Sequence, residues 1–349
     1  MNLYFIRKKD LSFEIIKSSD YIINKNLFFK EINLKGDLSK YFNKLFILNE
    51  NSNNPEIIYN NKYIYDIELL KSNLQKCIRR KHTNGALDTV NILIRQNIQQ
   101  LLRRLPIIAL EDSIIEFDDF IFLVWLMIAN SSGYNLNQID IDKILLIIQN
   151  ISESNYRDYI DNDLDSDFEY DNINNLDANN NIIKFYYSIF LRLEYGTMKG
   201  DKRWLQNLAN KWLNRLKKNS KIINKIKNNY EKLENYKFNE NILLKDYLLE
   251  SVDFHCHKNI FDEIKNKVGY YTNTDIKNAI WFLRSSINDK RKFISTNKKV
   301  EEFIKFYNLE QKKYSGTFDK IKNILDEISK DYWIKSIKKN NSLINYFKN

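Results

Sequence analysis

Glycine and proline are scarce in this chain, which has 7 glycines and 2 prolines in 349 residues. Average proteins contain about 7% glycine and about 5% proline. Doubly wound sheets, barrels and sandwiches use these residues at almost every tight connection, because glycine adopts left-handed backbone angles and proline fixes φ. The scarcity therefore argues against those folds and predicts long helices joined by polar loops.

Cysteine and long apolar runs are also rare. Two cysteines, Cys77 and Cys256, cannot form a framework of disulfides, which favours a reducing compartment. The N-terminus lacks the apolar run and small residues of a secretory signal. The most apolar segment, residues 120–129, is far shorter than the roughly 20 residues of a membrane span. We expect an intracellular protein of the cytoplasm or nucleus, neither secreted nor membrane-bound, with a buried helix at 120–129.

Signatures of catalysis and metal binding are missing as well. No GxxxxGK[ST] phosphate loop occurs. His255 and His257 resemble the first metal motif of the amidohydrolase superfamily, but the helical period around them would point the two rings about 200° apart. The acids of residues 161–171 lack the glycine and terminal glutamate of a calcium loop. We therefore expect no catalytic residue, metal or cofactor, although an active site assembled only in space stays open.

The composition is that of a folded protein. Hydrophobic residues make up 43% of the chain and aromatic residues 14%, whereas disordered chains are poor in both. Asn, Ile and Lys are abundant, and their codons are rich in A and T. This bias indicates an AT-rich genome, such as that of a large DNA virus or a protist, and says nothing of mechanism.

The net charge of +10 is unevenly distributed along the chain. Residues 71–104 have eight Lys or Arg against one acid, and residues 198–227 have ten against one. Residues 157–177, between them, have eight acids against one Arg. Clusters of one sign attract polyanions, and phosphate backbones are the commonest such partner. The alternative is that AT-rich coding inflates Lys everywhere and produces solvated faces that bind nothing.

Sequence periodicity divides the chain near residue 65. Before it, short runs rich in Ile, Phe and Tyr are broken by Asn, Ser and Gly36 and predict strands at 2–6, 13–16, 27–32 and 57–65. Beyond it, apolar residues recur with helical period. We expect a mainly α protein, a multi-helix bundle with a small N-terminal β-containing region.

Four regions follow from these shifts in pattern: a β-rich region at 1–65, a helical domain with a basic face at 66–152, an acidic flexible insertion at 153–181 and a second helical region at 182–349. The insertion is predicted because acids, Asn and Ser dominate it and apolar anchors are few. Helices are expected in the last region at 182–194, 204–218, 222–236, 242–258, 275–287, 300–307 and 318–347.

Residues 74–113 contain two arginine pairs within a helical apolar pattern. Neighbouring positions on a helix cannot both face the core, so one guanidinium of each pair must be exposed. Pro106 is expected in the first turn of a helix. Glu111 and Asp112 are near enough to pair with one arginine of a pair, which leaves the other for phosphate. We predict a continuous basic stripe that contacts nucleic acid through Arg79, Arg80, Lys81, Arg103 and Arg104.

The same block resembles the helical collar that follows the ATPase module in replication-associated recombination ATPases of the clamp-loader group. The matching residues are Leu74-Gln75-Lys76, Ile78-Arg79, Ala86-Leu87, Leu93, Arg103-Arg104-Leu105 and Glu111-Asp112. The resemblance covers about forty residues and implies a collar-like helical scaffold in replication or repair. The ATPase half is absent, so the resemblance implies no ATP hydrolysis.

A second basic segment lies at residues 188–216. Gly196 and Gly200 bracket its start, and Asp201 is placed to cap a helix that carries Trp204 and Trp212. A helix N-terminus beside Lys199, Lys202 and Arg203 would form an anion site. The competing interpretation is an interhelical turn with lysines on its rim, and both tryptophans are expected in the core rather than on a base-stacking platform.

Two functions remain open from sequence. The first is a non-enzymatic, nucleic-acid-associated helical protein, an accessory of replication, repair or transcription, with a protein partner possible. The second is a helical protein-interaction or structural scaffold with no nucleic-acid role. Nucleic-acid binding that weakens steeply with salt would support the first function, and negligible binding at physiological salt would support the second.

Overall fold

A computed structural model describes most of the chain, and the fold is mainly helical, at 66%, with an N-terminal four-stranded mixed sheet. This confirms the predicted fold class. The described residues are 1–21, 28–51, 65–159, 181–195, 199–217, 230–233, 236–238, 258–268, 272–282, 290–294, 298–313, 316 and 319–331. The histidine pair, the acids of 161–171, most of the acidic insertion, the strand expected before Tyr65 and most of the helices expected at 222–258 lie outside them.

The N-terminal sheet contains four strands in the order β2-β1-β4-β3. Their bounds are Asn2–Arg7 for β1, Phe13–Ser18 for β2, Phe28–Asn33 for β3 and Lys44–Asn49 for β4. β1 pairs antiparallel with β2 and parallel with β4, which pairs antiparallel with β3. Side chains alternate between two faces. Leu3 and Phe5 join the main core, whereas Tyr4 and Ile6 pack with Phe46 on the other face.

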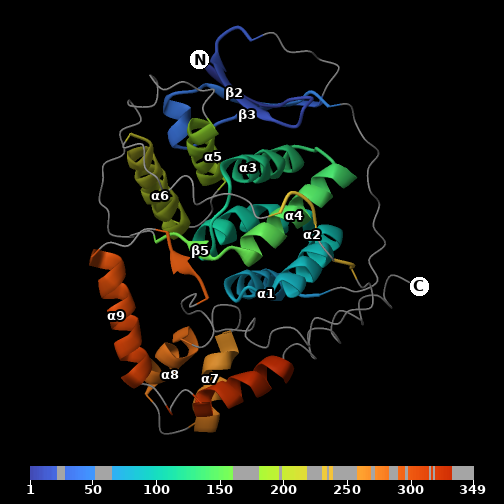
Figure 1. The fold of residues 1–349 in the computed structure, drawn as a ribbon. Coiled ribbons are helices and arrows are strands. Elements are labelled where there is room, and N and C mark those ends of the chain that lie inside the picture. Colours follow the sequence, from blue (N-terminus) through green and yellow to red (C-terminus); the bar gives the residue numbers. More distant parts are fainter. Residues whose placement is uncertain are drawn as a thin grey trace, which may run out of the picture.

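Six helices lie beneath the sheet (Figure 1). Their bounds are Ile67–Arg79 for α1, Thr83–Asp112 for α2, Phe117–Ser131 for α3, Gln138–Glu153 for α4, Asn181–Glu194 for α5 and Lys199–Lys217 for α6. α3 packs on β2, β4, α2 and α5, and α2 also packs on α1 and α4. A short 3-10 helix, η1, spans Asp37–Lys40 and contacts α5. α3 is apolar on every side and buried, which confirms the buried helix predicted at 120–129.

A single hydrophobic core joins the sheet to these helices and to parts of the C-terminal region. It includes residues from three of the four predicted regions, among them Phe5, Leu74, Trp125 and Phe190. The predicted division into four regions stays a prediction. No helix among the described residues is both long and apolar enough to cross a membrane.

Helix α2 is bent at Asn97, where φ is −160° and ψ is 79°. The Asn97 side-chain oxygen accepts a hydrogen bond from the Gln100 amide at 3.2 Å, so this residue caps the second half of the helix. Pro106 lies well inside that second half. The prediction of Pro106 in a first turn was therefore wrong, because the cap that starts the new segment comes from Asn97.

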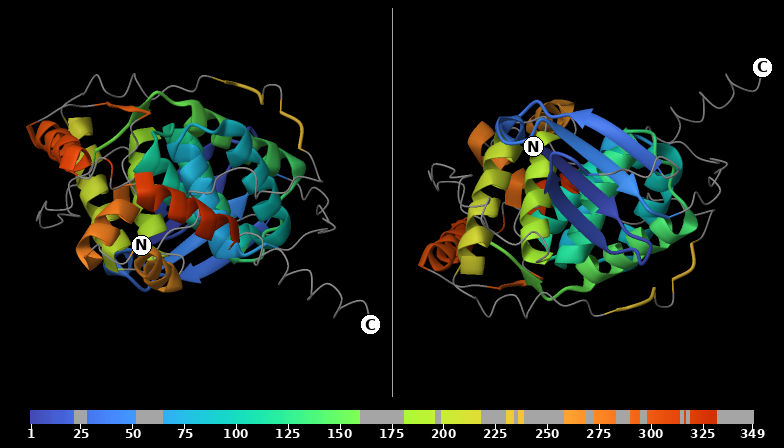
Figure 2. Two further views of the ribbon diagram at one scale, coloured as in Figure 1. Left: turned by 90° about the horizontal axis from the view of Figure 1, so that it is seen from below. Right: turned by 90° about the horizontal axis from the view of Figure 1, so that it is seen from above.

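The C-terminal region contributes short helices that lie below the main body in Figure 1 and are seen from below in the left view of Figure 2. They are α7 at Lys258–Val268, α8 at Asn273–Ile280, α9 at Lys298–Lys313 and a further helix at residues 319–331. α8 starts with a reciprocal capping box between Thr272 and Asp275. Two short strands, β5 at Tyr156–Arg157 and β6 at Lys292–Phe293, pair in parallel and bring this region against the end of α4.

A buried ion pair fixes the sheet to the helices. The Arg7 Nη1 of β1 lies 2.6 Å from the Asp140 Oδ1 in the first turn of α4, and both side chains are almost fully buried. The Tyr134 hydroxyl and the Asn137 amide donate to the other Asp140 oxygen at 2.9 Å and 3.1 Å. The Arg7 guanidinium also lies 5.5 Å from the Trp125 ring centre. The Asp140 carboxylate thus takes part in the cap of α4 and is also the counter-ion of Arg7.

We expect Asp140→Asn to destabilise the fold by about 3 to 5 kcal/mol, because it leaves the Arg7 charge buried without a counter-ion while nearly preserving shape. Urea denaturation followed by circular dichroism measures the change. Asp142→Asn is the matched control on the same helix, since Asp142 is exposed and bonds only Gln138 in the described structure. The control should shift stability by no more than about 0.5 kcal/mol. Equal effects from the two substitutions would contradict this role of the ion pair.

Candidate nucleic-acid interface

The turn that ends α1 has a lysine at a position where glycine is usual. The His82 amide donates to the Cys77 carbonyl at 2.8 Å and the Lys81 amide to the Ile78 carbonyl at 3.1 Å. This pair of bonds ends many helices, and glycine is the usual residue at the left-handed position. Here that position is Lys81, with φ of +59°. A side chain in this conformation costs roughly 1 to 2 kcal/mol, so the fold retains a lysine where glycine would be easier.

Arg291, just before β6, fills the space between the ends of α1 and α4. Its guanidinium donates to the carbonyl oxygens of Arg79, Ile151, Ser152 and Ser154 at 3.1, 2.6, 2.8 and 3.0 Å. These are carbonyls that lack partners within their helices, at ends that carry partial negative charge. Burial lowers the pKa of Arg291 to about 10. The negative charge of Asp112 acts to raise this pKa, and the positive charge of Arg157 acts to lower it.

The β5–β6 pair brings further cations to this place. The Arg157 guanidinium lies 4.2 Å from the centre of the Phe293 ring. The Lys81 ammonium donates to the Asn155 side chain at 2.6 Å, and the Lys292 amide donates to the Asn155 carbonyl at 2.9 Å. Segments far apart in sequence therefore meet at the α1 turn.

We call this group the basic cluster; its members are Arg80, Lys81, Arg157, Lys290, Arg291 and Lys292. Lys290 and Lys292 are exposed, and in the part of the chain that the structure describes neither has an ion-pair partner. Burial, with a smaller effect from the Arg291 charge, lowers the pKa of Lys81. Two carboxylates act on this group: the Asp112 charge has a raising effect on the pKa of Arg291, and the Glu153 charge has a raising effect on the pKa of Lys81. They oppose six cationic side chains, and Asp112 is also paired with Arg79. The cluster therefore has an excess of positive charge.

Arg79 does not belong to an open basic face, which corrects its prediction as a phosphate-contacting residue. Its guanidinium donates to the two Asp112 oxygens at 2.6 Å and 3.2 Å, and 11% of the side chain is exposed. Gln75 donates to the same carboxylate at 2.9 Å. Burial would raise the pKa of Asp112, but the charge and hydrogen bonds of Arg79 outweigh it and lower the pKa.

Arg103 and Arg104 lie on different sides of α2. The Arg104 guanidinium donates to the Gln75 side chain at 2.8 Å and lies 3.5 Å from the Glu111 carboxylate, on the side of α1. Arg103 is exposed and donates to the Tyr195 carbonyl at 3.4 Å, beyond the end of α5. The continuous stripe expected over the early helices is thus interrupted, because Arg104 is turned toward α1 and Arg103 toward the end of α5.

Helix α6 begins earlier than the predicted anion site required. α6 begins at Lys199, so Asp201 is its third residue rather than the residue before it. The prediction of Asp201 as the cap was therefore wrong. Lys202 and Arg203 are exposed in the first turns of α6. Trp212 is buried and packs against the Phe117 ring at 5.3 Å, which confirms its assignment to the core.

Sequence reasoning missed Arg157, Lys290, Arg291 and Lys292 as members of one site. The run Lys290-Arg291-Lys292 is a visible signal of positive charge. Its position beside α1 depends on the pairing of β5 with β6, two strands of two residues each. Such short strands leave almost no periodic pattern in a sequence.

No family model, curated protein or solved structure matches this chain. The resemblance of residues 74–113 to a clamp-loader collar stays a prediction. Among the described residues, no group of three or more His, Cys, Asp or Glu is arranged to hold a metal ion.

We expect Asp112→Asn to lower stability by about 3 to 5 kcal/mol at neutral pH, because it leaves the buried Arg79 charge without a counter-ion. The pKa of Asp112 is lower in the folded state than its ordinary value of 3.8. Its stabilisation is therefore present above about pH 4 and is lost as the pH falls through the folded-state value.

Urea denaturation of both proteins between pH 2 and pH 7 measures this dependence. The stability difference between wild type and Asp112→Asn should shrink as the medium is acidified. Glu111→Gln is the control, since Glu111 is half-exposed and its substitution should cost less than about 1 kcal/mol. A difference that does not vary with pH would show that the carboxylate charge is unimportant.

Proposed function

We propose that this protein binds the phosphate backbone of nucleic acid without catalysing a reaction, and that the basic cluster is the contact surface. The observation that carries the proposal is Lys81, a lysine held in a left-handed conformation beside Arg291, with Lys290 and Lys292 exposed next to it. Strained residues gather at functional sites because the surrounding structure stabilises an otherwise unfavourable conformation. A phosphate would relieve the mutual repulsion of these cations.

The expected mode of binding is electrostatic and independent of sequence. Lysine ammonium groups are flexible point charges suited to phosphate oxygens, and such contacts position a nucleic acid without reading its bases. Arg103 donates to the Tyr195 carbonyl beyond the end of α5, and Lys202 and Arg203 are exposed in the first turns of α6, so they would form a separate contact rather than extend the basic cluster. Affinity should therefore fall steeply with salt.

The accessory role and its location belong to the same proposal. A backbone-binding helical protein fits a replication, repair or transcription accessory of a large DNA virus or an AT-rich protist. Cys77, in α1, has a buried thiol in the main core. A buried thiol in a chain with two cysteines suits a reducing, intracellular compartment.

A helical scaffold without a nucleic-acid role is the second candidate. It is favoured by the internal use of arginines, since Arg79 pairs with Asp112 and Arg215 lies 2.7 Å from the buried Asp158. In that case the lysine excess reflects coding bias, and nucleic-acid affinity at physiological salt should be negligible.

The triple variant Lys81→Gln, Lys290→Gln, Lys292→Gln tests the proposed function. We expect weaker binding to a fluorescein-labelled 30-mer DNA duplex and a slope of log affinity against log salt that is reduced by about 2 to 3, since each lost phosphate contact removes about 0.9. Fluorescence anisotropy between 50 and 300 mM salt measures both quantities. A single-stranded RNA of equal length shows whether the contact discriminates DNA from RNA.

The matched control is Lys298→Gln, Lys305→Gln, Lys312→Gln, which removes the same charge from α9. Binding that is reduced equally by the two triple variants would indicate a general charge effect and contradict a site at the basic cluster. Absence of measurable binding by the wild type at 100 mM salt would favour the scaffold.

Lys81→Gly separates stability from function. Glycine relieves the left-handed strain at this position, so we expect the free energy of unfolding to stay equal or to rise by about 1 kcal/mol. Nucleic-acid affinity should fall nonetheless, because the ammonium is lost. Urea denaturation and anisotropy on the same sample measure the two effects, and a variant that is unstable as well as weak in binding would assign Lys81 a structural role.

A further inference from the structure

The helix α9 presents an unusual exposed face. Its opposite side is packed, since Val300 is buried, the Phe303 ring lies 5.6 Å from Tyr159 and the Tyr307 ring lies 5.1 Å from Phe282. Three large apolar residues of the same helix, Ile304, Phe306 and Leu309, are 40, 56 and 57% exposed. Phe306 and Leu309 lie on the side away from these contacts, and Ile304 lies on another side of the helix.

These three residues are half of the large hydrophobic residues that are exposed in the described chain. Single exposed apolar side chains are ordinary, but a group of them on one helix marks an interaction surface. Phe306 and Leu309 are three positions apart, so their side chains are neighbours. The helix therefore exposes apolar area that its own neighbours do not cover.

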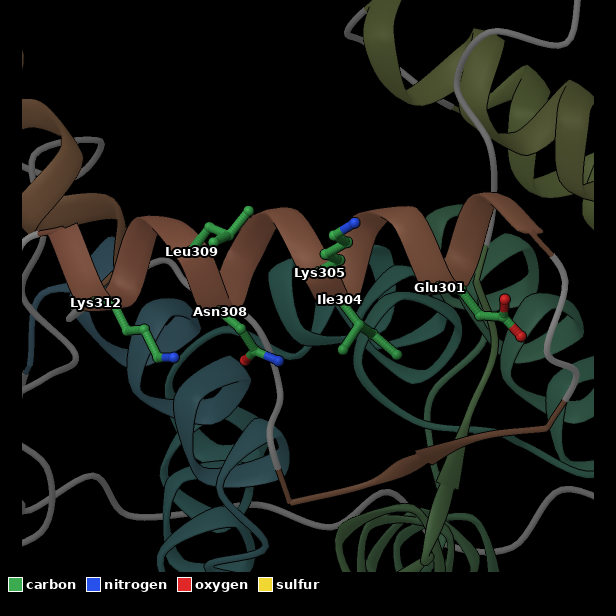
Figure 3. A pocket seen from close by; sticks show the side chains of 6 residues that line it. All are labelled: Glu301, Ile304, Lys305, Asn308, Leu309 and Lys312. Atoms are coloured by element: carbon green, nitrogen blue, oxygen red, sulfur yellow. The ribbon is translucent and has the colours of Figure 1, made fainter.

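A surface hollow of about 370 Å³ runs along the same helix between Ile304 and Leu309. Glu301, Lys305, Asn308 and Lys312 complete its described lining. Figure 3 shows Lys305 and Leu309 rising from one side of the helix while Ile304, Asn308 and Lys312 project from the other. The hollow thus combines apolar walls with two ammonium groups and one carboxylate.

The charges indicate the chemistry of the occupant. Lys305 and Lys312 are exposed, and neither forms an ion pair within the described ranges. They are seven residues apart, about two turns along the helix, and Figure 3 shows them on the two sides of the hollow. An apolar side chain of a partner that enters the hollow would contact Leu309 or Ile304, and acidic residues on either side of it would reach the two lysines. Glu301 and Asn308 offer further polar partners in the same lining.

We propose that the α9 face is a docking site for an acidic amphipathic helix of a partner protein. Apolar side chains at helical spacing would fill the hollow and cover Phe306 and Leu309, and flanking Glu or Asp would pair with Lys305 and Lys312. This surface is separate from the basic cluster, so the proposal goes beyond the proposed function and does not depend on it.

An anionic membrane is the less favoured occupant. Helices that lie on membranes carry Lys or Arg with few acids on the polar face. In α9 five lysines are offset by three glutamates, two of them, Glu301 and Glu302, in the first turns. Those carboxylates would be repelled by anionic headgroups, whereas a protein helix can place a polar or basic residue opposite them.

The test uses the full-length protein and a synthetic 18-residue peptide with Leu at helical spacing flanked by Glu, labelled with fluorescein. We expect saturable binding below about 1 mM, which is the affinity of a small single-helix contact. Phe306→Ser with Leu309→Ser should weaken binding at least about tenfold, because apolar anchors dominate such contacts. Lys305→Gln with Lys312→Gln should weaken it several-fold and reduce its salt dependence.

Two control variants are matched to these changes. Ile139→Ser alters an exposed apolar residue on α4, 46% exposed, and should leave peptide binding unchanged. Lys290→Gln with Lys292→Gln removes two charges from the basic cluster, and it should reduce DNA binding while peptide binding is retained. The two proposals can therefore fail separately.

Three results would overturn the α9 proposal. The first is no saturable peptide binding at 1 mM, or binding that the Phe306 and Leu309 substitutions do not weaken. The second is equal or tighter binding of a peptide with Lys in place of Glu, or preference for vesicles containing 30% phosphatidylserine over the acidic peptide. The third is a dimer in sedimentation velocity that these substitutions dissociate, since a second copy of this chain would then cover the face.

Discussion

The buried guanidinium of Arg291 joins the C-terminal region to the ends of helices α1 and α4. It donates four hydrogen bonds to carbonyl oxygens at the ends of α1 and α4. Removing a guanidinium from water costs several kcal/mol unless its donors are satisfied. Here the acceptors are carbonyls at or just beyond helix ends, which have no partner within the helix, so these bonds offset part of the desolvation cost on both sides. The basic cluster exists because this contact draws β6 against the α1 turn.

Arginine and lysine have different places in this molecule. Arg7, Arg79 and Arg215 are buried and each lies against a buried aspartate. The planar guanidinium can bond a carboxylate with two donors, whereas an ammonium retains its hydration more strongly. Several lysines, such as Lys290, Lys292, Lys305 and Lys312, remain at the surface. The arginines therefore stabilise the fold, and the exposed lysines are the groups on which both proposals depend.

Much of the fold was predictable because helical and strand periods are local properties. The apolar run at 120–129 identified the buried α3. The site was less predictable. The pattern around Arg79 and Arg80 predicted that one guanidinium of the pair is exposed, but the choice of Asp112 over Glu111 as the partner of Arg79 depends on how α2 lies against α1. The bend of α2 at Asn97 was not predicted from the sequence.

The sequence by itself determined that this chain is helical after residue 65, that it begins with a small sheet and that its cations greatly outnumber acids in two segments. Composition and periodicity suffice for these features, since each depends on residues near one another in the chain. Only the tertiary structure decided which cations are neutralised and which are exposed. That outcome depends on contacts between residues more than a hundred positions apart, such as Arg7 with Asp140 and Arg291 with Ile151. Burial and geometry determine how much free energy each buried charge costs, and neither can be deduced from the local sequence pattern.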